Sequence, residues 1–162
     1  MMLSKVRGRF TGVTGSIVDA VDEPKYSSVK AQIDVTTLIT GDPQRDEHLR
    51  SADFFDVDKH PTIAFVSRRV SGSRERFSVT GDLTIRGQTR EVTLDVTFNG
   101  VGTNPLGQAV AGFTAETHIN RKEFSLNWNM ALEAGGFLVG DDVKIEIELE
   151  AVRQDPPADV TN

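Results

Sequence analysis

The sequence predicts an all-β protein, an extended antiparallel up-and-down barrel of about eight strands with one short helix. Three observations favour this fold: apolar and polar residues alternate in several segments, short polar turns join these segments, and only one segment has helical features. An alternation with a period of two is typical of antiparallel strands that bury one face. A sheet of this kind removes its free edges when it closes into a barrel.

The alternation is clearest in four segments, residues 29–35, 77–85, 92–98 and 143–149. Residues 111–119 predict a further strand. Residues 63–66 predict another, but apolar residues of both parities leave its inner face undecided. The mixed, glycine-bearing stretch of residues 6–21 predicts one bent strand rather than two separate strands.

One helix is expected from residue 43 to about 51, because Asp42 can cap it and Pro43 occupies the favoured first position. Asn99-Gly100 and Asn104-Pro105-Leu106-Gly107 predict a loop between them. A second irregular piece is expected from Glu123 to Gly136. These features complete the predicted order of elements.

Length and composition limit the classes of protein to which the chain can belong. The chain has 162 residues, which favours one domain, residues 1–153, followed by a loose tail, residues 154–162. The net charge of −6 argues against a nucleic-acid partner. No cysteine, no secretory signal and no apolar run of transmembrane length are seen, so a cytoplasmic protein is expected.

The apolar positions of the predicted strands define the inner face of the barrel. None of these residues is ionisable. They could fill the interior as a packed core or line a cavity for a small ligand, and periodicity by itself favours the packed core. The predicted inner residues are Val29, Ala31, Ile33, Val35, Phe65, Phe77, Val79, Gly81, Leu83, Val92, Leu94, Val96, Phe98, Ala111, Phe113, Ala115, Ile119, Val143, Ile145, Ile147 and Leu149.

Catalytic, metal and cofactor chemistry are not indicated. The three histidines are scattered, and no second ligand is expected beside His48. No nucleophile-elbow motif brings Ser, His and Asp together. A hydrolase that uses His48 with Asp53 or Asp56 is the least favoured alternative. We therefore expect a protein that is not an enzyme and has no cofactor.

Three separated segments resemble the YceI-like family of polyisoprenoid-binding proteins: RDEHLRSADFFDVDKHPTIAF (residues 45–65), FSVTGDLTIRGQTREVTLDVTF (77–98) and GFTAETHINRKEF (112–124). Residues 125–152 also look like the family, so the resemblance covers nearly the whole chain in the right order. It implies a lipocalin-like barrel of eight strands, often a dimer. Its lumen would hold a long-chain isoprenoid, either a polyprenyl diphosphate or an isoprenoid quinone.

The resemblance also implies roles for individual residues. The family motif RxxHLxSxDFFD falls at residues 45–56, where Phe54 and Phe55 would plug the barrel from a covering helix and loop. The INR motif, residues 119–121, would fix a turn or a polar mouth. The polar candidates for the ligand head group are Arg45, His48, Arg50 and Arg121.

Two departures from the family pattern lead to further expectations. Ser125 stands where relatives usually have Gly, so the local turn is expected to differ. Relatives also usually carry a first strand ahead of residues 5–10. Either the true N-terminus lies upstream of Met1, or the barrel has a seam with exposed strand edges at which a homodimer could pair.

Two functions follow from these arguments. The first is a carrier or reservoir for a long isoprenoid lipid bound in an apolar lumen. The alternative is a stress-related interaction module with a packed, ligand-free barrel. The resemblance favours the first.

Overall fold

The computed structural model describes residues 6–18, 23, 25, 27–129 and 139–154. The irregular piece expected at 123–136 therefore lies partly outside the described residues, as does the tail after Gln154. The elements are β1 (Arg9–Phe10), β2 (Val13–Val18), β3 (Ser28–Asp34), η2 (Val35–Thr37), β4 (Leu38–Ile39), α1 (Pro43–Arg50), β5 (Thr62–Gly72), β6 (Arg76–Ile85), β7 (Gln88–Thr103), β8 (Ala109–Asn120), η3 (Arg121–Phe124) and β9 (Asp142–Val152).

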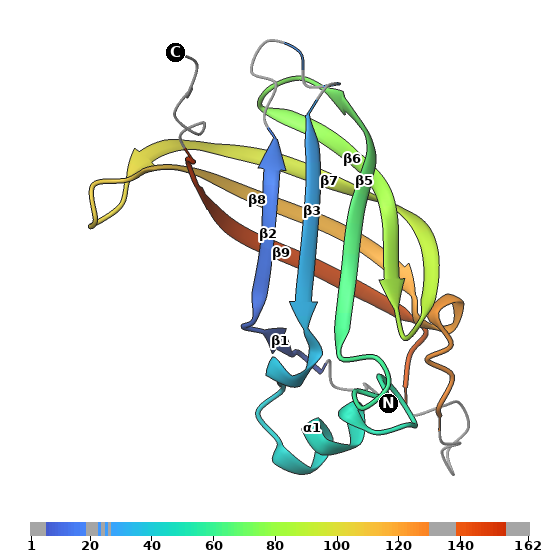
Figure 1. Ribbon diagram of the computed structural model, residues 1–162. Coiled ribbons are helices and arrows are strands. Elements are labelled where there is room, and N and C mark those ends of the chain that lie inside the picture. Colours follow the sequence, from blue (N-terminus) through green and yellow to red (C-terminus); the bar gives the residue numbers. More distant parts are fainter. Residues whose placement is uncertain (1–5, 19–22, 24, 26, 130–138, 155–162) are drawn as a thin grey trace, which may run out of the picture.

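Seven strands form one curled antiparallel sheet in the order β2-β3-β5-β6-β7-β8-β9. The sheet bends over so that β2 and β3 cross in front of β8 and β9, which gives a half-barrel (Figure 1). The prediction of an all-β antiparallel meander with one helix is confirmed. In the described part of the chain β2 and β9 are the two edges of the sheet and do not pair with each other. The half-barrel is therefore open along one side.

The pairing register places apolar residues of neighbouring strands on the same face. Ala31 of β3 pairs with Phe65 of β5, and Phe65 pairs with Leu83 of β6. Residues directly opposite each other in an antiparallel ladder point to the same side. This register resolves the ambiguous segment 63–66: Phe65 is buried inside, whereas Val66 is 45% exposed on the outer face.

The hairpin of β7 and β8 is longer than expected. The loop predicted from Asn99 to Gly107 is wrong, because β7 continues to Thr103 and only residues 104–108 form the turn. A bulge between Phe98 and Gly100 takes up the irregularity, and Gly100 has a positive φ of 115°. A glycine that interrupts the alternation marks a bulge as readily as a loop, and here the ladder resumes after it.

The single bent strand predicted for residues 6–21 is also wrong. β1 pairs with β4, and β2 pairs with β3, so the two segments belong to different sheets. They separate where the backbone N–H groups of Thr11 and Gly12 donate to the hydroxyl of Thr37, at 3.2 and 3.0 Å. These two donors therefore bond to a side chain at the end of the half-barrel instead of to a neighbouring strand.

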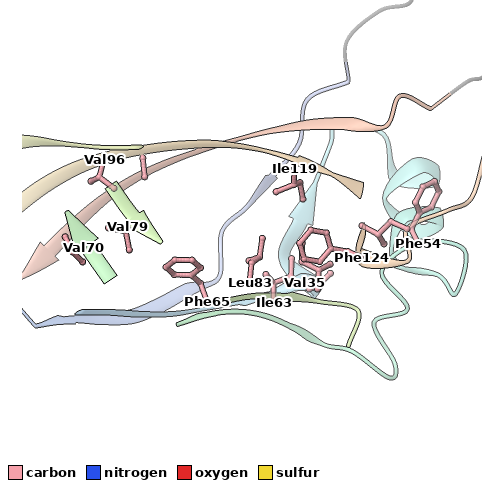
Figure 2. Packing of buried hydrophobic residues seen from close by; sticks show 13 residues of the cluster. Val35, Phe54, Ile63, Phe65, Val70, Val79, Leu83, Val96, Ile119 and Phe124 are labelled. Carbon is pink, nitrogen blue, oxygen red and sulfur yellow. The ribbon is translucent and has the colours of Figure 1, made fainter. Parts of the chain in front are cut away.

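The core lies inside the curl of the sheet and under α1. Figure 2 shows a row of buried side chains that runs from Val79 through Phe65 to Phe124 and Phe54. Phe124 has no exposed surface, and Val35, which was predicted on a strand, lies instead in η2 with 1% exposed. The end of the half-barrel nearest to α1 is thus packed with the chain's own side chains.

Ser125 closes η3 in the left-handed conformation, with φ 61° and ψ 22°. Ser125 thus adopts the conformation that glycine favours, and the expected difference from the turn of relatives stays a prediction. Its N–H is directed to the carbonyls of Arg121 and Lys122, which satisfies the end of the helix. The bonded turn holds Ser125 in a conformation that costs an L-residue roughly 1–2 kcal/mol.

We expect Ser125→Gly to raise the free energy of unfolding by about 1 kcal/mol, because glycine adopts the left-handed conformation without this cost. Urea denaturation of the purified protein measures the change. Ser125→Ala is the control and should give no gain, since alanine keeps the Cβ. Equal stability of the glycine and alanine variants would contradict the expectation.

Candidate functional site: an apolar trough

The concave face of the half-barrel is a trough lined by apolar side chains. Most of the predicted inner residues either belong to the buried cluster or pack against it. The structure therefore brings together, from six strands, Val29, Ala31, Ile33, Phe65, Phe77, Val79, Leu83, Val92, Leu94, Val96, Phe113, Ala115, Ile119, Ile145 and Ile147. Buried residues that the inner-face prediction missed are Leu38, Ile63, Val70, Ile85, Val110, Phe124 and Leu126.

The trough is not filled evenly. Its β5 and β6 side chains, such as Phe65 and Val79, are buried. Those of β3, β7 and β9, such as Ile33, Leu94 and Ile147, are only partly buried. An apolar ligand that covers such surface on a concave face removes it from water, which makes the free energy of binding more favourable. The apolar surface still exposed on the concave face therefore lies on β3, β7 and β9.

Two predicted inner residues lie at the margins. Val143, the second residue of the edge strand β9, is 38% exposed, although it pairs with the buried Ile119. Phe98 lies at the other end, partly buried, with its ring 5.5 Å from that of Phe113. Phe77 contacts Phe113 from the other side at 6.3 Å, edge to face. An aromatic cluster of these three residues therefore lines the trough towards the β7–β8 hairpin.

α1 and the loop that follows it, residues 51–61, cover the opposite end of the trough and are together called the cover. The Asp42 side chain caps α1, accepting from the N–H groups of Gln44 and Arg45 at 3.0 and 3.3 Å. After the helix, Phe54 enters the buried cluster, and the ring of Phe55 meets Phe10 at 6.0 Å. These positions fit the plug that the family resemblance implies.

Aromatic contacts hold the cover in place. The ring of Trp128 lies 5.3 Å from Phe54 and 4.6 Å from the imidazole of His48. The same imidazole meets Phe54 edge to face at 5.1 Å. The sequence places Trp128 far from residues 48–54, and only the tertiary structure brings these rings together. Trp128 is the one tryptophan of the chain, so its fluorescence reports on the cover.

The candidate head-group residues have different partners. Arg45 donates to the hydroxyl and the carbonyl of Thr40, at 2.9 and 2.8 Å. His48 Nε2 lies 2.9 Å from Asp53 Oδ2. Arg50 donates through Nη2 to the carbonyl of Leu38 at 2.8 Å, but its buried Nε has no hydrogen-bond partner among the described residues. Of these three residues, Arg50 thus has a buried donor left over.

Arg121 is buried, with 3% of its surface exposed. Its guanidinium donates to the carbonyls of Gly140, Leu126, Trp128 and Val139, and its Nη2 lies 3.6 Å from Asp141. Four of the five N–H groups of the guanidinium thus donate to carbonyls, and an ion pair with Asp141 adds to them. Arg121 therefore mainly holds η3 to the segments on either side of it.

Arg86 is a structural residue that the sequence analysis missed. It lies in the turn between β6 and β7 with a φ of 50°. Its guanidinium donates to the carbonyl of Ser125 at 2.8 Å and to that of Ala52 at 2.7 Å. It thereby ties the cover to the turn after η3. The only sequence signal for this position was the short Arg-Gly-Gln turn, which says nothing about distant carbonyls.

The residues of the least favoured alternative, a hydrolase, are partly brought together. His48 and Asp53 form a pair, but the Ser51 hydroxyl donates to the backbone carbonyl of His48 and not to its ring. Within the described ranges no group of three or more His, Cys, Asp or Glu side chains could hold a metal ion. Among the described residues, the His48 ring is thus positioned by Asp53, and the Ser51 hydroxyl is engaged by the backbone.

Ion pairs concentrate on the outer face of the sheet. Lys144 of β9 lies 3.4 Å from Glu116 and 3.0 Å from Glu146. Hydrogen bonds to Glu146 and Glu116 raise the pKa of Lys144, and the bond to Lys144 lowers the pKa of Glu146. His118, predicted to face outward, pairs with Asp142 at 3.1 Å and is exposed. The two faces of the sheet thus differ sharply in polarity.

The fold and the trough define a class of protein: an open antiparallel barrel with a charged outer face and an apolar inner face. No helix among the described residues is long and apolar enough to cross a membrane. The chain belongs to the YceI-like family, because the model of the YceI-like domain matches residues 1–151.

Known proteins similar to this chain agree with that assignment. A UPF0312 protein of Staphylococcus aureus (strain USA300) is 40% identical over 151 residues, which is 93% of this chain and 86% of the relative. Among solved structures, the YceI protein of Campylobacter jejuni has a TM-score of 0.80 at 25% identity, covering 96% of this chain and 89% of that one. BcnA of Burkholderia cenocepacia has a TM-score of 0.76 at 25% identity, covering 89% and 86%.

We expect Arg121→Met to lower the free energy of unfolding by about 3 kcal/mol or more, since several buried carbonyls lose their donor. Chemical denaturation followed by Trp128 fluorescence measures this. Lys122→Met is the matched control: Lys122 is exposed and pairs with the same Asp141 at 3.4 Å. Its removal should cost less than about 1 kcal/mol. Similar losses in both variants would contradict a specific role for Arg121.

Proposed function

We propose that this protein binds a long-chain isoprenoid lipid in the trough and acts as its carrier or reservoir, not as an enzyme. The observation that carries the proposal is the long apolar inner face, whose side chains on β3, β7 and β9 stay partly exposed. A flexible chain of repeated apolar units matches such a face, since it needs contact along its length and few polar partners. Membership of the YceI-like family supports the same class of ligand.

The free energy available is sufficient for tight binding. A chain of about 40 carbons would gain on the order of 30 kcal/mol in gross transfer, at about 0.8 kcal/mol per carbon. Association and ordering costs reduce this to a net value nearer 12 kcal/mol, at about 0.3 kcal/mol per atom. A dissociation constant in the nanomolar range follows, and a ligand held so tightly copurifies with the protein.

We place the polar head of the ligand, a diphosphate or a quinone ring, against the packed end of the trough beside α1. Arg50 is the strongest candidate there, because its buried Nε has no partner among the described residues and a buried donor gains most from a new acceptor. His48 is the second, through its ring. Arg45 and Arg121 support this end by binding backbone carbonyls. The homodimer and the cytoplasmic location remain predictions.

The alternative function, an interaction module with a packed interior, is favoured by one observation. Side chains such as Phe124, Val35 and Val79 fill part of the interior completely. If the open part of the trough also closes in solution, no room for a chain remains. The two functions therefore differ in whether an apolar molecule occupies the interior.

Organic extraction of the purified full chain, followed by mass spectrometry, distinguishes the two functions. The proposal expects a prenyl lipid in the extract, or saturable quenching of Trp128 fluorescence by an added long-chain isoprenoid quinone. Finding neither would leave the packed module as the better account.

Leu94→Glu should weaken binding of the isoprenoid quinone at least about tenfold, because a carboxylate on the inner face must lose water when the ligand covers it. The matched control is Thr97→Glu, which adds the same charge to the outer face of the same strand beside Arg76. It should bind as the wild type does. The titration of Trp128 fluorescence measures both variants, and equal binding by the two would argue against the trough.

A further inference from the structure

The hairpin between β7 and β8 projects beyond β6 on one side, while β9 pairs with β8 as far as Val110 on the other. β6 ends its pairing with β7 at Thr97, and β7 then continues to Thr103 against β8. Figure 1 shows this hairpin, in yellow and orange, reaching past the neighbouring strands. At about 3.3 Å per residue, the six residues after Thr97 extend the hairpin by roughly 20 Å.

The projecting segment carries no charge. Residues 96–115 contain no Asp, Glu, Lys or Arg, although 26% of the chain is charged and a segment of this length would ordinarily hold about five such residues. Its tip instead exposes large apolar side chains. Leu106 is 83% exposed and Val101 79%, the highest values for large apolar residues in the described part of the chain. Single exposed apolar residues are common, but their position on an uncharged projection is not.

The backbone at the tip is internally bonded. The N–H of Asn104 donates to the carbonyl of Gln108 at 3.0 Å, and that of Gly107 donates to the carbonyl of Asn104 at 2.9 Å. The side-chain oxygen of Asn104 accepts from the N–H groups of Leu106 and Gln108, at 3.0 and 2.9 Å. These groups keep their hydrogen bonds in a medium of low polarity, which reduces the cost of bringing the tip into it.

The apolar surface of the hairpin continues into the trough. Phe98 and Phe113 lie at the base of the hairpin on the inner face, next to Phe77 of β6. The nearest charged residues along this side are Arg74, Glu75 and Arg76, in and after the β5–β6 turn, which border residues 97–100. On the other side, β9 brings Glu150 opposite Gly112 and Arg153 beside Ala109. Residues 96–115 of the hairpin itself thus offer an uncharged path from the tip to the aromatic cluster, with charged residues along both borders.

We propose that the tip of this hairpin, centred on Leu106 and Val101, docks on the surface of a lipid bilayer. The choice of a bilayer as partner rests on the proposed function, because a carrier must meet the membrane that holds its ligand. An uncharged tip also suits a protein with a net charge of −6, since an anionic docking surface would be repelled by lipid phosphates. The hairpin then forms the route by which the lipid passes between bilayer and trough.

Flotation of the full chain with phosphatidylcholine vesicles tests this inference. The wild type should float with the vesicles, and Leu106→Asp should lower the partition coefficient at least about tenfold, because a carboxylate replaces an apolar side chain at the contact. Val66→Asp, which adds the same charge to an exposed valine of the outer face, is the matched control and should float as the wild type does. Leu106→Trp should retain binding, since tryptophan favours the interface.

Salt and ligand titrations complete the test. Binding should persist when salt is raised from about 0.1 M to about 1 M, because an apolar contact is not screened. Failure of the wild type to float would overturn the inference. Loss of binding at high salt would also overturn it and would point to contact with lipid phosphates. Equal flotation of Leu106→Asp and the wild type would overturn it and would point to another surface of the protein. Quinone binding in solution should be unchanged in Leu106→Asp. If neither protein bound quinone while flotation still depended on Leu106, the proposed function would fail and the docking inference would stand.

Discussion

The pairing register of the seven-stranded sheet is the constraint on which the rest of the structure depends. Because directly opposite residues share a face, the row Ala31, Phe65 and Leu83 puts apolar side chains inside and leaves charged residues such as Lys144 outside. A shift of one residue in any pair would turn a whole strand inside out. The trough exists because the register holds across all these strands while the edges β2 and β9 stay apart.

The two ends of the trough are built differently, and the difference suits binding of a chain with a polar head. At one end, the partly buried Arg86 links the loop after α1 to the turn after η3, and the buried Arg121 binds four carbonyls around η3. At the other end, a long hairpin without charges extends from an aromatic cluster around Phe113. Hydrogen bonds from arginine side chains hold the segments at the α1 end, whereas the hairpin end is open and apolar.

The cover also links the interior to a spectroscopic signal. Trp128 contacts both His48 and Phe54, so a ligand that moves Phe54 or the α1 loop must change the surroundings of the single tryptophan. The buried Nε of Arg50 lies in the same region of the chain. Occupancy of the trough and the state of its cover can therefore be followed in one fluorescence experiment, without a label.

The sequence by itself determined the alternating strands, most of their inner face and the helix cap at Asp42, because alternation and capping are local properties of neighbouring residues. It also identified the family. Only the tertiary structure decided which inner residues are covered. Val143 has the right parity but lies at an open edge, and Phe124 is fully buried because η3 turns it under the cover. The partners of Arg121 lie across chain segments whose approach no local pattern encodes.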